Sequence, residues 1–391
     1  METGRVEFTL RGRGLKLDSA ADMAPFVAEI EQLGSGLTHV CVSGNTFGVE
    51  AGLSLARALE NKTQLRHADL SDMFTGRLRA EIPLVLSALG SALTNAPLEH
   101  LDLSDNALGP AGAIPLAPLL STNGHIRRLT LNNNGLGVTG GIVIADALRA
   151  SAPSRKAPLE SIECGRNRLE DGSMSAWAAC FAEHASLTCV SFPQNGIRMG
   201  GIATLVNALR SSPLTKLDVQ DNTVAFKGSL ALATALPSWP ALAILNVGDC
   251  LLTPPGASAL FAALDSTPAL LSSLRSLILT YDEINAPVLA ALIAVIPRMQ
   301  NLDTLHLNGN TFAADSPTAD NLRSTLTAAN KLHILDDLDD MEVLTDDEST
   351  SASSDEDDVK DDNEDEISTP AQDRDDSVDA LAAAISSTLA V

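Results

Sequence analysis

The sequence predicts an α/β solenoid in which short parallel strands line a concave side and helices form the convex side. Three observations predict it. A Leu-rich phrase, LxxLxLxxNxL, recurs through most of the chain, its xLxL part alternates with period two, and the stretch after it places apolar residues at i, i+3, i+4 and i+7. Each unit is therefore one strand followed by one helix. Neither buries its apolar face alone, so consecutive units must stack.

An Asn closes the phrase in seven copies, and degenerate copies extend the same column. The seven are Asn45, Asn106, Asn134, Asn167, Asn195, Asn222 and Asn310; the degenerate copies place Arg13, Met73, Cys250 and Asp282 in the column. Successive columns lie 27 to 33 residues apart, so about eleven units occupy residues 1–335. This is the signature of leucine-rich repeats and predicts a ribonuclease-inhibitor-like horseshoe.

The Asn column has a structural interpretation. An amide turned inward can satisfy backbone N–H and C=O groups that are left unpaired where a strand ends, and such groups are costly when they stay bare. Cys250 is then a substitute in this column, which explains it without redox chemistry.

Charge is concentrated near the C-terminus. The chain carries a formal net charge of −24, and residues 336–376 hold 20 acidic residues against two basic ones, which leaves −6 for the remainder. The segment 336–376 has almost no large apolar residues and is predicted to be a disordered acidic tail, whereas 377–391 has enough Ala and Leu for a short helix. Nucleic-acid binders need a basic face, so a basic protein partner is the better expectation.

Other function classes find little support. The N-terminal stretch lacks the apolar core of a signal peptide, and the longest apolar run, APVLAALIAVI, is too short to cross a bilayer. Five cysteines without CxxC spacing fit a reducing, cytoplasmic setting. GLGVTG at 135–140 matches a dinucleotide fingerprint, but the same glycines recur in other units and are scaffold.

We therefore expect no membrane contact, no cofactor and no autonomous active site. The chain has no P-loop and no GxSxG elbow, and its seven histidines lie singly in different units. Only His67 and His100, which precede core strand positions, are placed to approach one another on neighbouring strands, and without a Cys or carboxylate motif beside them no metal site is expected.

The stretch SDMFTGRLRAEIP, residues 71–83, departs from the repeat. Met73 replaces the column Asn, the following Gly is out of register, and two arginines stand in an otherwise acidic chain. One interpretation is a worn repeat in which Met73 packs and Arg77 is a solvated loop residue. The other is a functional loop at the strand-to-helix edge, since it abandons the consensus while the flanking strands keep it. Spacing alone leaves both open.

These residues resemble a known family. SDMFTGR closely resembles the SDIFTGR-containing loop of the Ran GTPase-activating proteins, and LTLNNNGLG resembles their Asn-rich strand end. The resemblance covers residues 1–376 and fits the fungal or protist form without targeting domains. It implies acceleration of GTP hydrolysis by Ran in support of nucleocytoplasmic transport, with Ran-GTP as partner and a Ran-binding protein as a further candidate partner.

The resemblance also implies site residues. Arg77 and Asn133 match the positions important for catalysis, and Asn133 would orient the glutamine of the GTPase that positions the attacking water. Arg79, Asp72, Asp105 and Asn132 match positions for contact with the GTPase. Asp72 and Asp105 either hold Arg77 or pair with basic residues of Ran. Two roles stay open for Arg77, contact with the nucleotide or with the GTPase only.

A rival function needs no catalysis. Polar variable positions beside the strand leucines, such as Asp69 and Asp102, predict a concave surface that a non-catalytic inhibitor or scaffold would use for a protein partner. The low cysteine content argues against the ribonuclease inhibitors, which are Cys-rich, as the relevant relatives.

Overall fold

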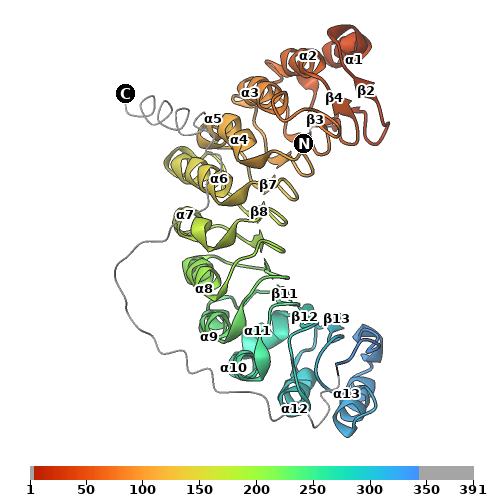
Figure 1. Ribbon diagram of the computed structural model, residues 1–391, viewed down its shortest axis with the longest axis vertical. Coiled ribbons are helices and arrows are strands. Elements are labelled where there is room, and N and C mark those ends of the chain that lie inside the picture. Colours follow the sequence, from red (N-terminus) through yellow and green to blue (C-terminus); the bar gives the residue numbers. More distant parts are fainter. Residues whose placement is uncertain (1–3, 343–391) are drawn as a thin grey trace, which may run out of the picture. The chain divides into compact units, whose positions relative to one another are not determined.

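The computed structural model describes residues 4–342 (Figure 1). Strands and helices alternate along this part of the chain. The strands are β1 (Glu7–Thr9), β2 (Lys16–Leu17), β3 (His39–Cys41), β4 (Thr46–Phe47), β5 (His67–Asp69), β6 (His100–Asp102), β7 (Arg128–Thr130), β8 (Ser161–Glu163), β9 (Cys189–Ser191), β10 (Lys216–Asp218), β11 (Ile244–Asn246), β12 (Ser276–Ile278) and β13 (Thr304–His306).

The helices follow the strands on the outer side of the stack (Figure 1). They are α1 (Ala20–Gln32), α2 (Val49–Leu59), α3 (Ile82–Leu93), α4 (Gly109–Ala113), α5 (Ala117–Thr122), α6 (Gly137–Ser151), α7 (Glu170–Glu183), α8 (Met199–Ala208), α9 (Ala225–Ala235), α10 (Thr253–Asp265), α11 (Pro268–Ser273), α12 (Ala286–Val295) and α13 (Pro317–Ala328). None of these helices is long and apolar enough to span a membrane.

Eleven strands form one parallel sheet, with the spatial order β1, β3 and then β5 to β13 in sequence. β2 and β4 form a separate two-stranded sheet. Figure 1 shows the strands on the inner side of the curved stack and the helices on its outer side. The predicted fold class, an α/β solenoid of leucine-rich repeats, is confirmed.

The core is continuous from unit to unit. The middle residue of each strand in the large sheet is buried, as in Leu101 of β6 and Leu129 of β7, and the helices contribute an inner stripe such as Ile144 and Leu148 of α6. The first and last residues of each of these strands face the concave side. The buried residues of all the units form one hydrophobic cluster, so no unit has a hydrophobic core of its own.

The Asn column stitches the units together, as its spacing predicts. Asn134 shows the pattern: its Nδ2 donates to the carbonyls of Leu103 (3.0 Å) and Leu131 (2.9 Å), and its Oδ1 accepts from the backbone N–H of Asn106 (3.0 Å). One buried carboxamide therefore satisfies polar groups of two consecutive units. Asn106, Asn167, Asn195, Asn222 and Asn310 repeat this arrangement.

Met73 interrupts this ladder without leaving carbonyls bare. By the pattern, an Asn at this position would donate to the carbonyls of Val42 and Leu70. The carbonyl of Val42 instead accepts a hydrogen bond from Nδ2 of Asn45 (2.9 Å), and the carbonyl of Leu70 accepts one from Nδ2 of Asn106 (2.8 Å). Met73 itself is fully buried in the core. The neighbours thus cover the loss, which frees this unit to build a different loop.

Residues 336–342 lie against the last repeat. The carboxylate of Asp336 accepts the N–H groups of Leu307 (2.9 Å) and Asn308 (3.0 Å), and the N–H of Glu342 donates to the carbonyl of Asn310 (2.9 Å). These contacts cover the open edge of β13, where unpaired backbone groups would otherwise face solvent. The remainder of the predicted acidic tail and the segment 377–391 lie outside the described residues.

Asp282 stands in the Asn column as an acid. Its Oδ1 accepts the N–H of Cys250 (3.0 Å), whereas its Oδ2 is buried without a partner among the described residues. Burial raises the pKa of Asp282 well above its usual value. In the neutral form the carboxylic O–H can donate to a carbonyl as the Asn amide does, which the carboxylate cannot.

We predict that Asp282→Asn stabilises the protein at neutral pH by about 1–3 kcal/mol, because it removes the cost of an unsatisfied buried group. The raised pKa means that the folded state binds the proton more tightly than the unfolded state. The Asp282 contribution is therefore present below pH ~3.9 and is lost as the pH rises through the folded pKa.

The measurement is the urea midpoint of wild type and variant at acidic and neutral pH. The gain should be larger at neutral pH. Asp249→Asn, an exposed acid in the preceding strand-to-helix loop, serves as the control and should change little. A midpoint of Asp282→Asn that is unchanged or lower at neutral pH contradicts the prediction.

Candidate functional site

The strand-to-helix rim is a row of loops with one shared backbone conformation. The residue before each column position has a positive φ: 44° at Asp72, 60° at Asp105 and 55° at Asn133. The N–H of each donates to a carbonyl of the next loop, those of Ser104, Asn132 and Gly165, at 2.9 Å in all three cases. Asn and Asp tolerate this left-handed region better than most residues. The rim is therefore a rigid ladder whose side chains point outward.

Asn133 is an exposed carboxamide held in place by one neighbour. Its Nδ2 donates to Oδ1 of Asp105 at 2.8 Å. Its Oδ1 has no hydrogen-bond partner among the described residues. The structure thus brings the sequence-predicted Asn133 and Asp105 together, and it leaves the amide oxygen available to a partner molecule.

The two flanking asparagines serve the scaffold. Asn132 is half-buried, and its Oδ1 accepts the N–H of Gly165 at 2.7 Å. Asn134 is buried in the column. Of the three consecutive asparagines, Asn133 is the exposed one, Asn132 is half-buried and Asn134 is buried.

Arg77 points into the molecule. Its Nε donates to Oγ1 of Thr46 (2.8 Å), and its two terminal nitrogens donate to Oδ1 of Asp18 (2.5 Å), the carbonyl of Thr46 (2.9 Å) and that of Leu17 (3.3 Å). The side chain is only 10% exposed. Its hydrogen bond also lowers the pKa of Asp18. Arg77 therefore fastens the loop 74–79 to the small sheet of β2 and β4.

The hypothesis that Asp72 or Asp105 holds Arg77 is wrong. Asp72 accepts a hydrogen bond from Oγ1 of Thr75 (2.6 Å), and Asp105 accepts one from Nδ2 of Asn133. The partner is Asp18, which lies 59 positions earlier in the chain. Sequence analysis missed it because Asp18 belongs to the irregular N-terminal unit and carries no motif.

The rest of the loop is built to keep this shape. Phe74 is buried, and the N–H of Arg77 donates to its carbonyl at 2.9 Å. Gly76 has a φ of 77°, a conformation that side chains rarely adopt. Glu81 closes the turn by accepting the N–H of Leu78 at 2.9 Å. Arg79 is left exposed at the surface of this fixed loop.

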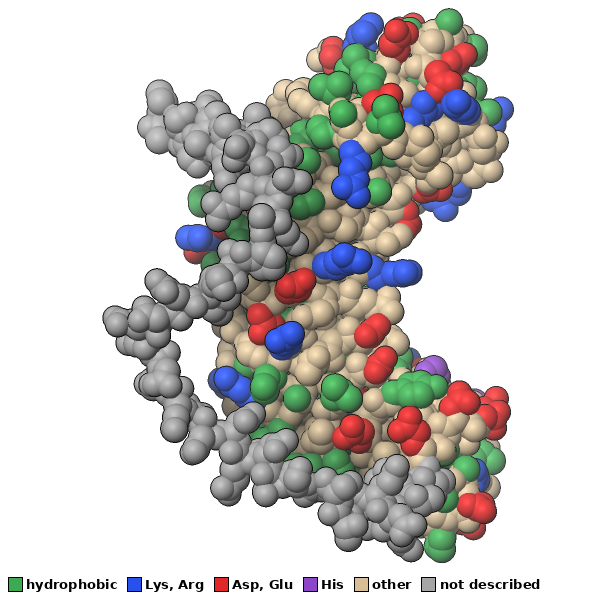
Figure 2. All heavy atoms as spheres, in the orientation of Figure 1, with side chains coloured by type: hydrophobic (Ala, Val, Ile, Leu, Met, Phe, Trp, Pro, Cys, Tyr) green, Lys and Arg blue, Asp and Glu red, His purple; other side chains and the backbone are tan. Residues whose placement is uncertain are grey.

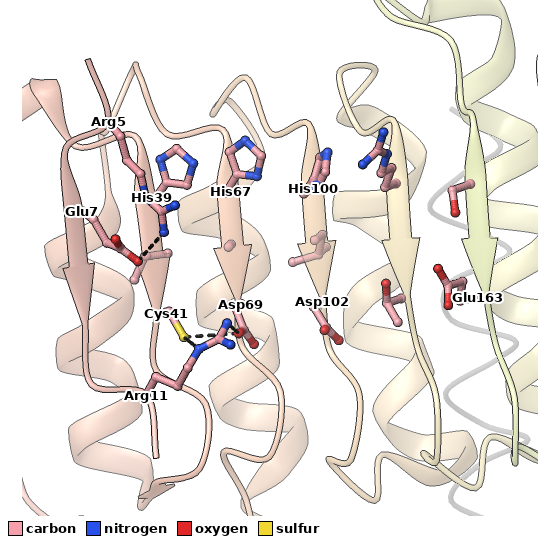
Figure 3. A pocket seen from close by; sticks show the side chains of 16 residues that line it. Arg5, Glu7, Arg11, His39, Cys41, His67, Asp69, His100, Asp102 and Glu163 are labelled. Carbon is pink, nitrogen blue, oxygen red and sulfur yellow. Dashed lines mark hydrogen bonds and ion pairs between the residues drawn. The ribbon is translucent and has the colours of Figure 1, made fainter. Parts of the chain in front are cut away.

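A groove of about 480 Å³ crosses the concave side of the first strands, with His39, His67 and His100 in a row on β3, β5 and β6 (Figure 3). The ring centroids are 4.1 Å and 4.4 Å apart, so His67 and His100 do meet on neighbouring strands. Burial lowers the pKa of all three, that of His67 to about 4. The row is neutral at physiological pH.

The described residues contain no group of His, Cys, Asp and Glu arranged to hold a metal ion. On the face shown in Figure 2, basic and acidic side chains are interspersed over the described residues, and they do not form a continuous basic surface there. Nucleic acids need such a surface.

A family model described as "Leucine Rich repeat" matches residues 94–117. Ran GTPase-activating protein 1 of Saccharomyces cerevisiae is 34% identical over 335 residues, 81% of this chain and 81% of the relative. Ran GTPase-activating protein 1 of Xenopus laevis is 38% identical over 203 residues, 50% of this chain and 35% of the relative. Ran GTPase-activating protein 2 of Caenorhabditis elegans is 36% identical over 198 residues, 49% of this chain and 20% of the relative.

The aligned part thus spans most of the yeast relative, about a third of the Xenopus relative and a fifth of the Caenorhabditis relative. Among solved structures, the complex of Rad7 and Elc1 in yeast matches with a TM-score of 0.47 and 13% identity, covering 80% of this chain and 77% of that chain.

We predict that Arg77→Ala loosens the loop 74–79 and lowers the free energy of unfolding by about 3 kcal/mol, since it removes four hydrogen bonds from a charged donor, one of them to a half-exposed ion-pair partner. Hydrogen exchange should quicken at the amides of residues 46–48 and 74–79. Arg79→Ala is the matched control, because Arg79 is exposed in the same loop. Equal exchange rates in the two variants would show that the contacts of Arg77 do not hold the loop.

Proposed function

The chain belongs to the Ran GTPase-activating protein family, and we propose from this premise that it stimulates GTP hydrolysis on Ran by positioning a group of the GTPase, without an active site of its own. The identity to the yeast relative extends over 81% of both chains, which supports the activity as a property of the whole repeat body. The non-catalytic inhibitor or scaffold is not favoured. The observation that carries the mechanism is the exposed, braced carboxamide of Asn133.

Asn133 is proposed to orient the glutamine of Ran that positions the attacking water. Its backbone is fixed by the rim ladder and its side chain by Asp105, so little freedom is lost when the GTPase docks. Fixing the orientation of a reacting group before the chemical step is a large source of rate acceleration. In this proposal Asp105 is a positioning residue, because it acts through Asn133.

Arg77 is proposed to act as a positioning residue too. An arginine finger must reach the transferred phosphate with a free guanidinium. Here the guanidinium is 10% exposed and bonded to Asp18, Thr46 and Leu17. The contact with the GTPase is assigned to the exposed Arg79, and Asp72 and Asn132 are proposed to contribute to the docking surface from the rim.

The cellular part of the proposal is that this activation of Ran-GTP occurs in the cytoplasm and supports nucleocytoplasmic transport, with a Ran-binding protein as a candidate third member of the complex. The five free cysteines are compatible with a reducing compartment. Imaging of a fluorescently tagged chain checks the placement, and accumulation inside the nucleus would contradict it.

We predict that Asn133→Ala lowers the single-turnover rate of GTP hydrolysis on Ran by about 10²-fold at saturating activator, because the orienting group is lost. The concentration for half-saturation should change little. Gln194→Ala is the matched control: Gln194 has the same positive φ on the rim (54°) and donates to Asp221 (2.7 Å) as Asn133 donates to Asp105.

The outcomes separate function from site. No acceleration by the wild-type chain would end the activator proposal. If the wild-type chain accelerates hydrolysis and Asn133→Ala accelerates it equally, the proposed function stands and the proposed site is rejected. An equal loss in Gln194→Ala would mean that damage to the rim in general, and not the carboxamide of Asn133, explains the effect.

We predict that truncation after Glu342 slows association with Ran at low salt by about tenfold or more and leaves the maximal rate unchanged. Residues 343–391 carry 16 acidic and two basic residues, and a charge of this size attracts a basic partner over a distance that salt shortens. The cut must follow Glu342, because 336–342 bind the last repeat. Stopped-flow mixing across a salt series measures this, and a salt-independent loss would instead indicate a direct contact.

A further inference from the structure

Two consecutive strands of the concave side carry the same acidic motif. The sequence DLSD occurs at 69–72, at the end of β5, and at 102–105, at the end of β6. Asp69 and Asp102 are register partners in the sheet. In each copy the serine two residues on donates its N–H to Oδ1 of the aspartate, at 3.2 Å from Ser71 and 2.9 Å from Ser104. The two carboxylates therefore have the same local setting.

The first of these carboxylates is occupied by an arginine of the chain itself. Arg11 reaches over from the end of β1, its terminal nitrogen lies 2.7 Å from Oδ2 of Asp69, and its Nε lies 3.3 Å from Sγ of Cys41 (Figure 3). Burial opposes ionisation of Asp69, but the hydrogen bonds from Ser71 and Cys41 and the charge of Arg11 outweigh it and lower the pKa.

The second carboxylate has no such partner. Among the described residues no cation lies within ion-pair distance of Asp102, and Arg128, in register with His100 on the next strand, does not reach it. Burial raises the pKa of Asp102, and the neighbouring carboxylates of Asp69 and Asp105 add to this. A partly desolvated carboxylate without a counter-ion gains more from an incoming cation than a solvated one does.

The histidine row favours one kind of cation. His67 and His100 stand two residues before Asp69 and Asp102 on the same two strands and line the same groove (Figure 3). The ring of His67 lies between those of His39 and His100, whereas the ring of His100 has a ring neighbour among the described residues only in His67. Both rings are neutral and carry a nitrogen lone pair. A guanidinium is planar and carries five donors, so it can stack on a ring and bond a carboxylate together, whereas an ammonium is a point charge.

We propose that the groove at Asp102 is a binding site for an arginine side chain presented by a protein partner. Asp102 takes the guanidinium as Asp69 takes Arg11, with the rings of His67 and His100 beside it. The 480 Å³ groove is open to the concave side and has room for such a side chain. The site is separate from the Asn133 rim and does not depend on the proposed action on Ran.

The test is titration of the full chain at pH 7 with the blocked tripeptide acetyl-Gly-Arg-Gly-amide, followed by NMR of the labelled imidazole groups of His67 and His100. We expect saturable binding of one equivalent. The corresponding lysine tripeptide should bind at least about tenfold more weakly, and Asp102→Asn should weaken arginine binding by at least about tenfold. Asp218→Asn is the matched control, because Asp218 holds the same strand position on β10, outside the groove.

A second variant tests the equivalence of the two carboxylates by gain of binding. Arg11 is 70% exposed, so Arg11→Ala should fold normally and leave Asp69 open. We expect this variant to bind a second equivalent of the arginine tripeptide. The proposal is overturned if wild type shows no saturable binding, if lysine binds equally well, if Asp102→Asn binds as wild type does, or if Arg11→Ala still binds one equivalent.

Discussion

The inward carboxamide of the Asn column is the interaction on which the rest of the molecule depends. Strand and helix meet at a buried turn in every unit, and the backbone groups of that turn cannot reach water. An Asn such as Asn134 satisfies carbonyls of its own unit and of the unit before it, and accepts an N–H from the latter. The same bonds that remove the desolvation cost also fix the spacing and register of neighbouring units. The units therefore stack through the same hydrogen bonds that satisfy their buried backbone groups.

The rim inherits its precision from this ladder. Because the column residue is fixed, the residue before it is forced into the left-handed conformation with its side chain outward, and the N–H groups of successive rim residues join one loop to the next. Asn133 is thus placed by the scaffold and only its side chain needs a further contact, from Asp105. At Met73 the carboxamide is missing, and the loop that follows takes its shape from Arg77 and Glu81 instead.

The regular part of the fold is predictable from the sequence, and the irregular part is not. Periodicity identifies the strands, the helices and the column, and the register of parallel strands follows from it, which is why the meeting of His67 and His100 could be expected. The bond between Arg77 and Asp18 could not, because it joins residues 59 positions apart through a unit that has lost the consensus. The contacts of residues 336–342 with the last repeat could not be predicted from their acidic composition either. Asp336 acts there as an acceptor for the N–H groups that follow the last strand and not as a solvated charge.

The two catalytic candidates are therefore different in kind. Hydrogen bonds to a charged group contribute about 1.5–3 kcal/mol each in favourable settings, and Arg77 makes four of them, of which the one to the half-exposed Asp18 counts for less. If its release cost only about 2.7 kcal/mol, the outward-pointing form would be near 1% of the population, and a rate that required this form would fall by the same factor. An arginine finger at this position would first have to break the hydrogen bonds that hold its own side chain. Asn133 faces no such cost, because its amide oxygen is already exposed and its nitrogen already held. The hydrogen bonds that keep Arg77 from reaching the phosphate also fix the loop. A fixed loop presents Arg79 and the rim to a docking protein in one arrangement.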